Sequence, residues 1–169
     1  MRAGTAKVDV TPGTNIWMDG MVRTHKSVGT HDSLFARALV LANNSNASNA
    51  FVVVSADICA LGEKDTLLLR QAASSKTGIP ETRMIIASTH THSGPATIGL
   101  FTPVEREYVE ELVGKLAVLI EKAFSKMKPV AVGWGSGRED TISHYRRLLS
   151  KDGHVVMNWE AYPAEDLTG

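Results

Sequence analysis

The sequence predicts an α/β fold: a mixed β-sheet with flanking helices and a strand–helix–strand parallel crossover. Three features of the 169 residues support this prediction. Short apolar runs rich in β-branched residues are separated by clusters of turn residues. Two longer segments repeat apolar residues with the spacing of amphipathic helices. One of these segments lies between two apolar runs, and parallel neighbouring strands need a connection of that length.

The first half of the chain predicts three strands and one long loop. Residues 4–10 alternate and stop at a Thr-Pro-Gly turn, so they predict the first strand. Residues 14–32 are rich in Gly, Thr, Asp and His without periodicity, and they predict a long loop of the kind that often carries function. Phe35–Ala42 and Phe51–Ala56 predict two strands, and the polar segment 43–49 between them indicates a hairpin.

The second half predicts two helices and further strands. Glu63–Thr77 has helical spacing and ends before a glycine, and the apolar run 84–87 then predicts a strand parallel to the one before the helix. A Thr-Pro-Val-Glu sequence at 102–105 predicts the capped start of the second helix, whose apolar stripe extends to Phe124. Residues 130–134 predict one more strand, and the polar remainder contains only short apolar pieces.

Composition and charge limit the classes of partner. Eighteen basic residues balance eighteen acidic ones, which gives no electrostatic reason to expect nucleic acid. No stretch reaches the roughly 18 apolar residues of a membrane span. The N-terminal residues contain no long apolar run, so we expect no signal peptide. We therefore expect a soluble, cytoplasmic protein, or a secreted one if a leader has been removed. Cys59 is the single cysteine, which rules out a disulfide within the chain and favours a buried structural thiol over a reactive one.

The strongest candidate site is the segment 87–95, Ala-Ser-Thr-His-Thr-His-Ser-Gly-Pro, which follows the strand predicted at 84–87. Ligands of open α/β sheets bind beyond the carboxyl ends of the strands. On an extended backbone His90 and His92 point the same way, so both could reach one metal ion or one substrate group. Imidazole is a common zinc ligand. The alternative is two histidines satisfied by hydrogen bonds in a polar loop.

Asp57 ends the neighbouring apolar strand. If the two strands are parallel, Asp57 and His90 face the same crevice, where the carboxylate could bind a metal directly or orient a ligand histidine. The alternative is that Asp57 caps the helix Glu63–Thr77.

Two further candidates are single polar groups. His31 lies beside Asp32, whose carboxylate could fix the imidazole tautomer, although such a histidine can equally be structural. Arg146, in the sequence His-Tyr-Arg-Arg at 144–147, could hold a carboxylate or an oxyanion, or could belong to a solvated strand edge.

Residues 89–95, Thr-His-Thr-His-Ser-Gly-Pro, resemble the signature of the neutral/alkaline, non-lysosomal ceramidases. Weaker likenesses to the same family occur in order at 3–12, 29–41, 53–57 and 145–147, where Tyr145 replaces the family's asparagine. The resemblance implies that the chain is the N-terminal portion of a ceramidase-like catalytic domain and that this domain is incomplete within the 169 residues.

The resemblance also implies an activity and roles for individual residues. Members of the family use one zinc ion to hydrolyse the amide of N-acylsphingosine to a fatty acid and sphingosine. By match, His90 is a zinc ligand, His92 contacts the substrate or the transition state, and Arg146 is an active-site arginine. The expected substrate is this lipid amide or a related one, because the Gly-Gly-Tyr that usually follows the signature is replaced by Ala-Thr-Ile at 96–98.

The family's remaining zinc ligands and its serine-containing motif lie further along than Gly169. We therefore expect the 169 residues alone to bind zinc weakly and to be inactive. Two alternatives stay open. The chain could be a non-catalytic domain that keeps the fold and binds a ligand or a partner. It could also be a metal hydrolase in which both histidines are ligands.

Overall fold

A computed structural model describes residues 1–143, 145–160 and 163–168 of the chain. They form two compact units, Met1–Val132 and Gly133–Gly169, which are described separately. No helix among these residues is long and apolar enough to cross a membrane.

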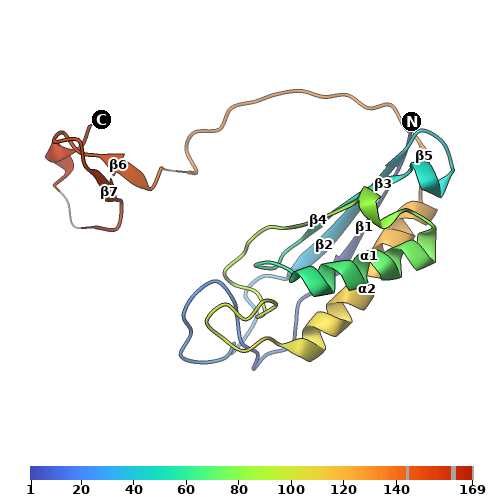
Figure 1. Cartoon of the computed structure of the whole chain (residues 1–169), viewed down its shortest axis with the longest axis horizontal. Coiled ribbons are helices and arrows are strands. Elements are labelled where there is room, and N and C mark those ends of the chain that lie inside the picture. The colour runs from blue at the N-terminus through green and yellow to red at the C-terminus, as the bar shows by residue number, and fades with distance from the viewer. Residues whose placement is uncertain (144, 161–162, 169) are drawn as a thin grey trace. The chain divides into compact units, whose positions relative to one another are not determined.

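The first unit contains a mixed five-stranded sheet, as the sequence predicted (Figure 1). Its order is β4-β3-β2-β1-β5, with β1 at Arg2–Asp9, β2 at Phe35–Ala42, β3 at Phe51–Ala56, β4 at Met84–Ser88 and β5 at Lys128–Pro129. β2 pairs with β3 as the predicted antiparallel hairpin, and β3 pairs with β4 in parallel. The parallel register aligns Ala56 with Ser88, so these two strands end at the same edge of the sheet.

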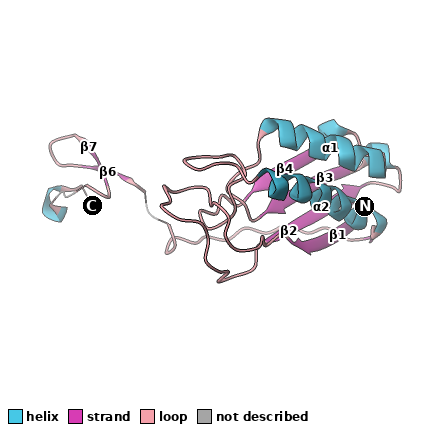
Figure 2. Cartoon of the chain, turned by 90° about the horizontal axis from the view of Figure 1, so that it is seen from below, coloured by secondary structure: helices cyan, strands magenta, loops and turns pink. Residues whose placement is uncertain are grey.

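Two helices, α1 (Glu63–Thr77) and α2 (Arg106–Ser125), cover one face of the sheet (Figures 1 and 2). α1 ends at Gly78, whose φ of 73° places it in the left-handed region that favours glycine. The apolar stripe of α2 is buried against the sheet and α1, and its largest fully buried members are Val109, Leu112, Leu116, Leu119 and Ile120.

Small residues on the sheet let the helices approach closely. Ala36, Ala38 and Val40 of β2 are buried beneath them. On β1, a Cβ added at Gly4 would lie 2.0 Å from the carbonyl oxygen of Ala123, so the backbones of β1 and α2 are in direct contact. Any side chain at position 4 would push the end of the helix away from the sheet.

The start of α2 differs from the prediction. The helix begins at Arg106, with Glu105 at the N-cap position and no side-chain capping hydrogen bond. The two expected capping residues instead make tertiary contacts. Glu105 accepts a hydrogen bond from the Trp17 backbone N–H at 2.7 Å, and Thr102 Oγ1 lies 3.5 Å from the Met18 carbonyl oxygen. Both contacts tie the helix start to the long loop.

The strand predicted at residues 130–134 is wrong, since β5 contains only Lys128 and Pro129. β5 pairs antiparallel with the first residues of β1, and the Val130 N–H donates to the Met1 carbonyl oxygen. Residues 130–134 belong to no strand, and Trp134 is 96% exposed.

The second unit is small. β6 (Arg147–Leu149) and β7 (Val155–Met157) form an antiparallel hairpin, followed by a 3-10 turn at Ala164–Asp166. Hydrogen bonds from the Ser150 hydroxyl and from His154 lower the pKa of Asp152 to about 2. The carboxylate helps to hold the connection between the two strands, together with the hydrogen bond from the Ser150 N–H to the His154 carbonyl oxygen at 2.9 Å.

Candidate metal centre

The parallel pairing of β3 and β4 continues beyond the ends of the two strands. The Thr89 N–H donates to the Ala56 carbonyl oxygen at 3.0 Å, and the His90 N–H donates to the Ile58 carbonyl oxygen at 3.1 Å. Residues 57–60 therefore run beside residues 89–92. Asp57 and His90 lie at the same edge of the sheet, as the sequence predicted.

This arrangement brings Cys59, His90 and His92 together. One donor atom from each of the three side chains lies within 4.8 Å of the others. The thiol is buried and both histidines are exposed, so the cluster opens to the surface through the imidazoles. Sulfur and imidazole nitrogen are a donor set typical of zinc sites.

His90 has an unusual backbone conformation. Its φ is 61°, in the left-handed region that residues with a side chain seldom adopt. We expected an extended backbone to point the two histidines the same way. The backbone at His90 is not extended, so that reason is wrong, but the two side chains do lie close together. Their ring centroids are 4.9 Å apart in an edge-to-face arrangement.

One hydrogen bond determines which ring nitrogen of His90 has an available lone pair. Nδ1 lies 2.8 Å from the Cys59 carbonyl oxygen, and a carbonyl can only accept. Nδ1 therefore carries the proton and donates, which leaves the lone pair on Nε2. A backbone carbonyl holding the second nitrogen is a common feature of metal-binding histidines.

The long loop between β1 and β2 holds His92 in place. A Cβ added at Gly20, whose φ is 95°, would lie 2.4 Å from the His92 ring. The Arg23 guanidinium donates to the His92 carbonyl oxygen at 2.6 Å. The loop thus closes over the ring from one side and binds its backbone.

Asp19 anchors the same loop to the segment that follows the histidines. Its carboxylate is fully buried and accepts backbone hydrogen bonds from Thr97, Ile98 and Leu100 at 2.7 to 3.0 Å. Sequence reasoning missed this residue, because its partners are nearly 80 positions away. The only local signal is an Asp-Gly pair after two apolar residues, which indicates a turn and nothing more.

Cys59 was also missed as a site residue. Its Sγ lies 3.6 Å from His90 Nδ1, and burial, with a smaller contribution from Asp19, raises the pKa of its thiol. The sequence did contain a signal for it. Cys59 lies three residues beyond the end of β3, and His90 lies two residues beyond the end of the parallel β4.

The Asp57 side chain contacts the start of β2. Its carboxylate accepts a hydrogen bond from the Phe35 N–H at 2.9 Å and pairs with Arg37 at 3.3 Å, both at the start of β2. The alternative that it caps α1 is wrong, since the N-cap residue is Gly62. No hydrogen bond of Asp57 among the described residues joins it to a histidine, and its role toward a metal stays a prediction.

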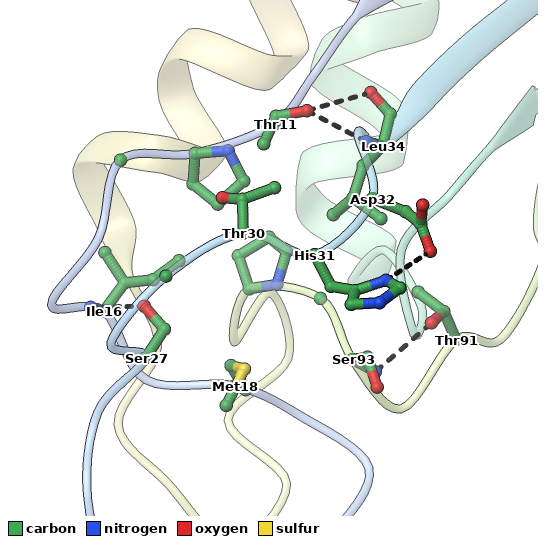
Figure 3. A pocket seen from close by; sticks show the side chains of 15 residues that line it. Thr11, Ile16, Met18, Ser27, Thr30, His31, Asp32, Leu34, Thr91 and Ser93 are labelled. Carbon is green, nitrogen blue, oxygen red and sulfur yellow. Dashed lines mark hydrogen bonds and ion pairs between the residues drawn. The ribbon is translucent and has the colours of Figure 1, made fainter.

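His31 lies away from the cluster, on a cavity of about 430 Å³ between the long loop and the signature segment (Figure 3). Its Nδ1 is 2.8 Å from Asp32, as the sequence suggested, and both side chains are almost fully exposed. Thr91 and Ser93 line the same cavity. The residues that alternate with the histidines therefore border the cavity, while the histidines themselves join Cys59.

Arg146 belongs to the second unit, where its guanidinium lies 5.6 Å from the Trp159 ring. Its predicted role in catalysis stays a prediction. His144, from the same group of residues, lies outside the described part of the chain.

No protein-family model matches the chain. The neutral ceramidase of Pseudomonas aeruginosa is 26% identical over 160 residues, an alignment that covers 88% of this chain and 24% of the ceramidase. The crystal structure of that ceramidase superimposes on 76% of this chain with a TM-score of 0.67 at 25% identity. The resemblance to the neutral ceramidases is confirmed.

A second structure, of a ceramidase complexed with C2, has the same TM-score and identity. The chain covers 22% of each of these crystallised proteins and about a quarter of the length of the curated relative. The structural likeness thus concerns about three quarters of this chain and less than a quarter of a larger ceramidase.

Proposed function

We propose that the protein is a zinc-dependent hydrolase of an amide bond, acting on N-acylsphingosine or a related lipid amide. One observation carries the proposal. The segment that matches the ceramidase signature is also the segment whose histidines form a metal-type donor cluster at the carboxyl ends of β3 and β4. Sequence likeness and local chemistry therefore point to the same residues.

The donor set fits zinc in its chemistry. His90 presents Nε2 with a free lone pair, because Nδ1 donates to the Cys59 carbonyl oxygen. His92 and Cys59 offer further nitrogen and sulfur donors nearby. Softer donors of this kind favour zinc over magnesium or calcium, which prefer oxygen. A bound zinc ion would polarise the amide carbonyl and make water more acidic.

The residues of the chain would divide the remaining work. His90 holds the metal through Nε2. His92 lies next to it, held by Gly20 and Arg23, and donates a hydrogen bond to the oxygen on which charge develops as the amide is attacked. Arg146 supplies a second positive group to that oxygen, as its match to the family implies. In this proposal the chain is the N-terminal part of the catalytic domain.

The test is hydrolysis of a fluorescent N-acylsphingosine and a panel of other N-acyl amides by the longer protein that, in this proposal, contains this chain. The 169 residues alone are the comparison, which we expect to be inactive. We expect release of the fatty acid, loss of activity on dialysis against a chelator, and recovery on addition of zinc. A protein that retains full zinc and hydrolyses none of these amides would contradict the proposal. That outcome would favour a non-catalytic domain that keeps the fold and binds a ligand.

A further inference from the structure

One face of the five-stranded sheet carries large apolar side chains that are not part of the core. Both helices of the first unit lie over the opposite face, whose side chains form the core (Figure 2). On the face without helices, which we call the open face, five large apolar side chains alternate with the buried ones and lie outside the core cluster: Leu39, Leu41, Phe51, Val53 and Ile85. Ile85 is 49% exposed and Phe51 is 37% exposed.

The strand register makes these five side chains neighbours. Leu39 pairs with Val53 and Val53 pairs with Ile85, so one apolar row crosses three strands. Leu41 pairs with Phe51 in the next row. Paired residues project to the same side of a sheet, so the two rows form one apolar patch.

The sequence of the strands indicates that this patch is covered in the native protein. A sheet face that meets water carries polar residues at alternate positions, whereas strands covered on both faces are apolar almost throughout. β1 has the first pattern, since Thr5, Lys7 and Asp9 on this face are all exposed. β2, β3 and β4 have the second pattern over the two apolar rows. The covered area therefore lies over these three strands and ends at β1.

We propose that the open face is the docking surface for the part of the catalytic domain that follows these 169 residues in the longer protein. This inference rests on the proposed function, which makes the chain one part of such a domain. The alignment with the ceramidase of Pseudomonas aeruginosa covers 88% of this chain and 24% of the ceramidase. About three quarters of that relative therefore has no counterpart here, and a domain of that size packs further layers against its sheet.

The position of the open face fits this occupant. The apolar rows lie away from the sheet edge that holds His90, and the ion pair of Arg37 with Asp57, at 3.3 Å, lies between them and that edge. A layer packed on the apolar rows reaches the candidate metal centre past these polar groups. It can there supply the zinc ligands that the resemblance places further along the chain. A lipid surface fits less well, because acidic and basic side chains are mixed at this border.

Thiol accessibility in the longer protein tests the proposal, because Cys59 is buried and adds little background. Ile85→Cys places a thiol on the open face. Leu68→Cys is the matched control, since Leu68 is 46% exposed on α1. We expect Ile85→Cys to react with a maleimide about tenfold or more slowly in the longer protein than in the 169-residue chain, because a covered thiol reacts only when the structure opens. Leu68→Cys should react equally fast in both.

A charged substitution gives a second measurement that does not depend on labelling. Ile85→Lys should lower the Tm of the longer protein, where it buries a charge without a partner, and should leave the Tm of the 169-residue chain unchanged. Leu68→Lys should leave both unchanged. Circular dichroism shows whether each variant is folded.

The outcomes separate this proposal from the proposed function. Equal labelling of Ile85→Cys in the two proteins would overturn the docking surface, and amide hydrolysis by the longer protein in the same samples would leave the proposed function intact. Protection of Ile85→Cys without hydrolysis would support the docking surface and overturn the proposed function. Protection that appears already in the 169-residue chain and is lost on dilution would make a second copy the occupant, which also overturns the proposal.

Discussion

At the scale of single residues, His90 carries two constraints at once. Its backbone has a positive φ of 61°, and its Nδ1 is bound to the carbonyl oxygen of Cys59. A non-glycine residue in this region is strained by about 1 kcal/mol or more, and strained residues cluster at functional sites. The left-handed backbone conformation directs the imidazole toward the end of β3, where it lies beside Cys59.

Gly20 provides a test of how His92 is positioned. We expect Gly20→Ala to destabilise the fold by about 1–3 kcal/mol, because the new Cβ would lie 2.4 Å from the His92 ring and the residue has a φ of 95°. Gly29→Ala, in the same loop, is the matched control, since nothing lies within 4 Å of its added Cβ. Chemical denaturation of both variants measures the difference. Equal stabilities would show that the loop does not press on His92.

Asp19 makes a second prediction at this scale. Replacing it by alanine leaves three backbone N–H groups without their acceptor, so Asp19→Ala should cost about 3 kcal/mol of unfolding free energy. Asp32→Ala is the control: its side chain is 87% exposed, and we expect a change below about 0.5 kcal/mol. A small effect at Asp19 would mean that other contacts hold the segment after the histidines.

At the scale of the elements, the helices and the central strands follow from local patterns, and the site does not. The β3–α1–β4 crossover was predicted because apolar runs flank a helix of sufficient length. The start of α2 was predicted wrongly because Glu105 looks like a capping residue in the sequence. In the structure its side chain forms a tertiary hydrogen bond instead. Cys59 joins the histidines only through the register of two parallel strands, which no local pattern determines.

The contact between α1 and α2 gives a prediction for this scale. Asp65 of α1 accepts two hydrogen bonds from the Arg106 guanidinium of α2, at 2.9 and 3.3 Å, and its side chain is 11% exposed. Asp65→Ala should therefore lower the free energy of unfolding by about 1–2 kcal/mol.

The exposed pair within α2 is the control for this prediction. Glu111 lies 62% exposed beside Lys115, and Glu111→Ala should change stability by less than about 0.5 kcal/mol. Thermal and denaturant unfolding of the two variants decide the matter. A loss at Glu111 as large as that at Asp65 would contradict this account of the helix pair.

At the scale of the whole molecule, the core belongs to the first unit. All buried members of the core cluster lie between Val10 and Ala123, and the three donors of the candidate metal centre lie within the same span. We therefore expect residues 1–132 alone to fold, with a free energy of unfolding within about 1 kcal/mol of the longer chain. Loss of cooperative unfolding in the shortened chain would show that residues after 132 are needed for the fold.

The sequence predicted a function mainly through one heptapeptide, which resembles the ceramidase signature. That resemblance assigned different roles to His90 and His92. The structure shows different surroundings for the two histidines, and the two roles are part of the proposed function. His90 has its tautomer fixed by a backbone carbonyl, while the ring of His92 is positioned by packing against Gly20. A metal ligand and a residue that contacts the substrate have different consequences when they are removed.

The zinc content of purified His90→Ala and His92→Ala, each made in the longer protein that we propose contains this chain, tests this claim most directly. We expect His90→Ala to lose zinc, because it removes the nitrogen whose lone pair is free for the metal. His92→Ala should retain zinc and lose roughly 10²–10³ in kcat, the scale of one donor to a developing negative charge. Equal zinc loss in both variants would mean that both histidines are ligands. Full zinc in His90→Ala would contradict the metal assignment itself.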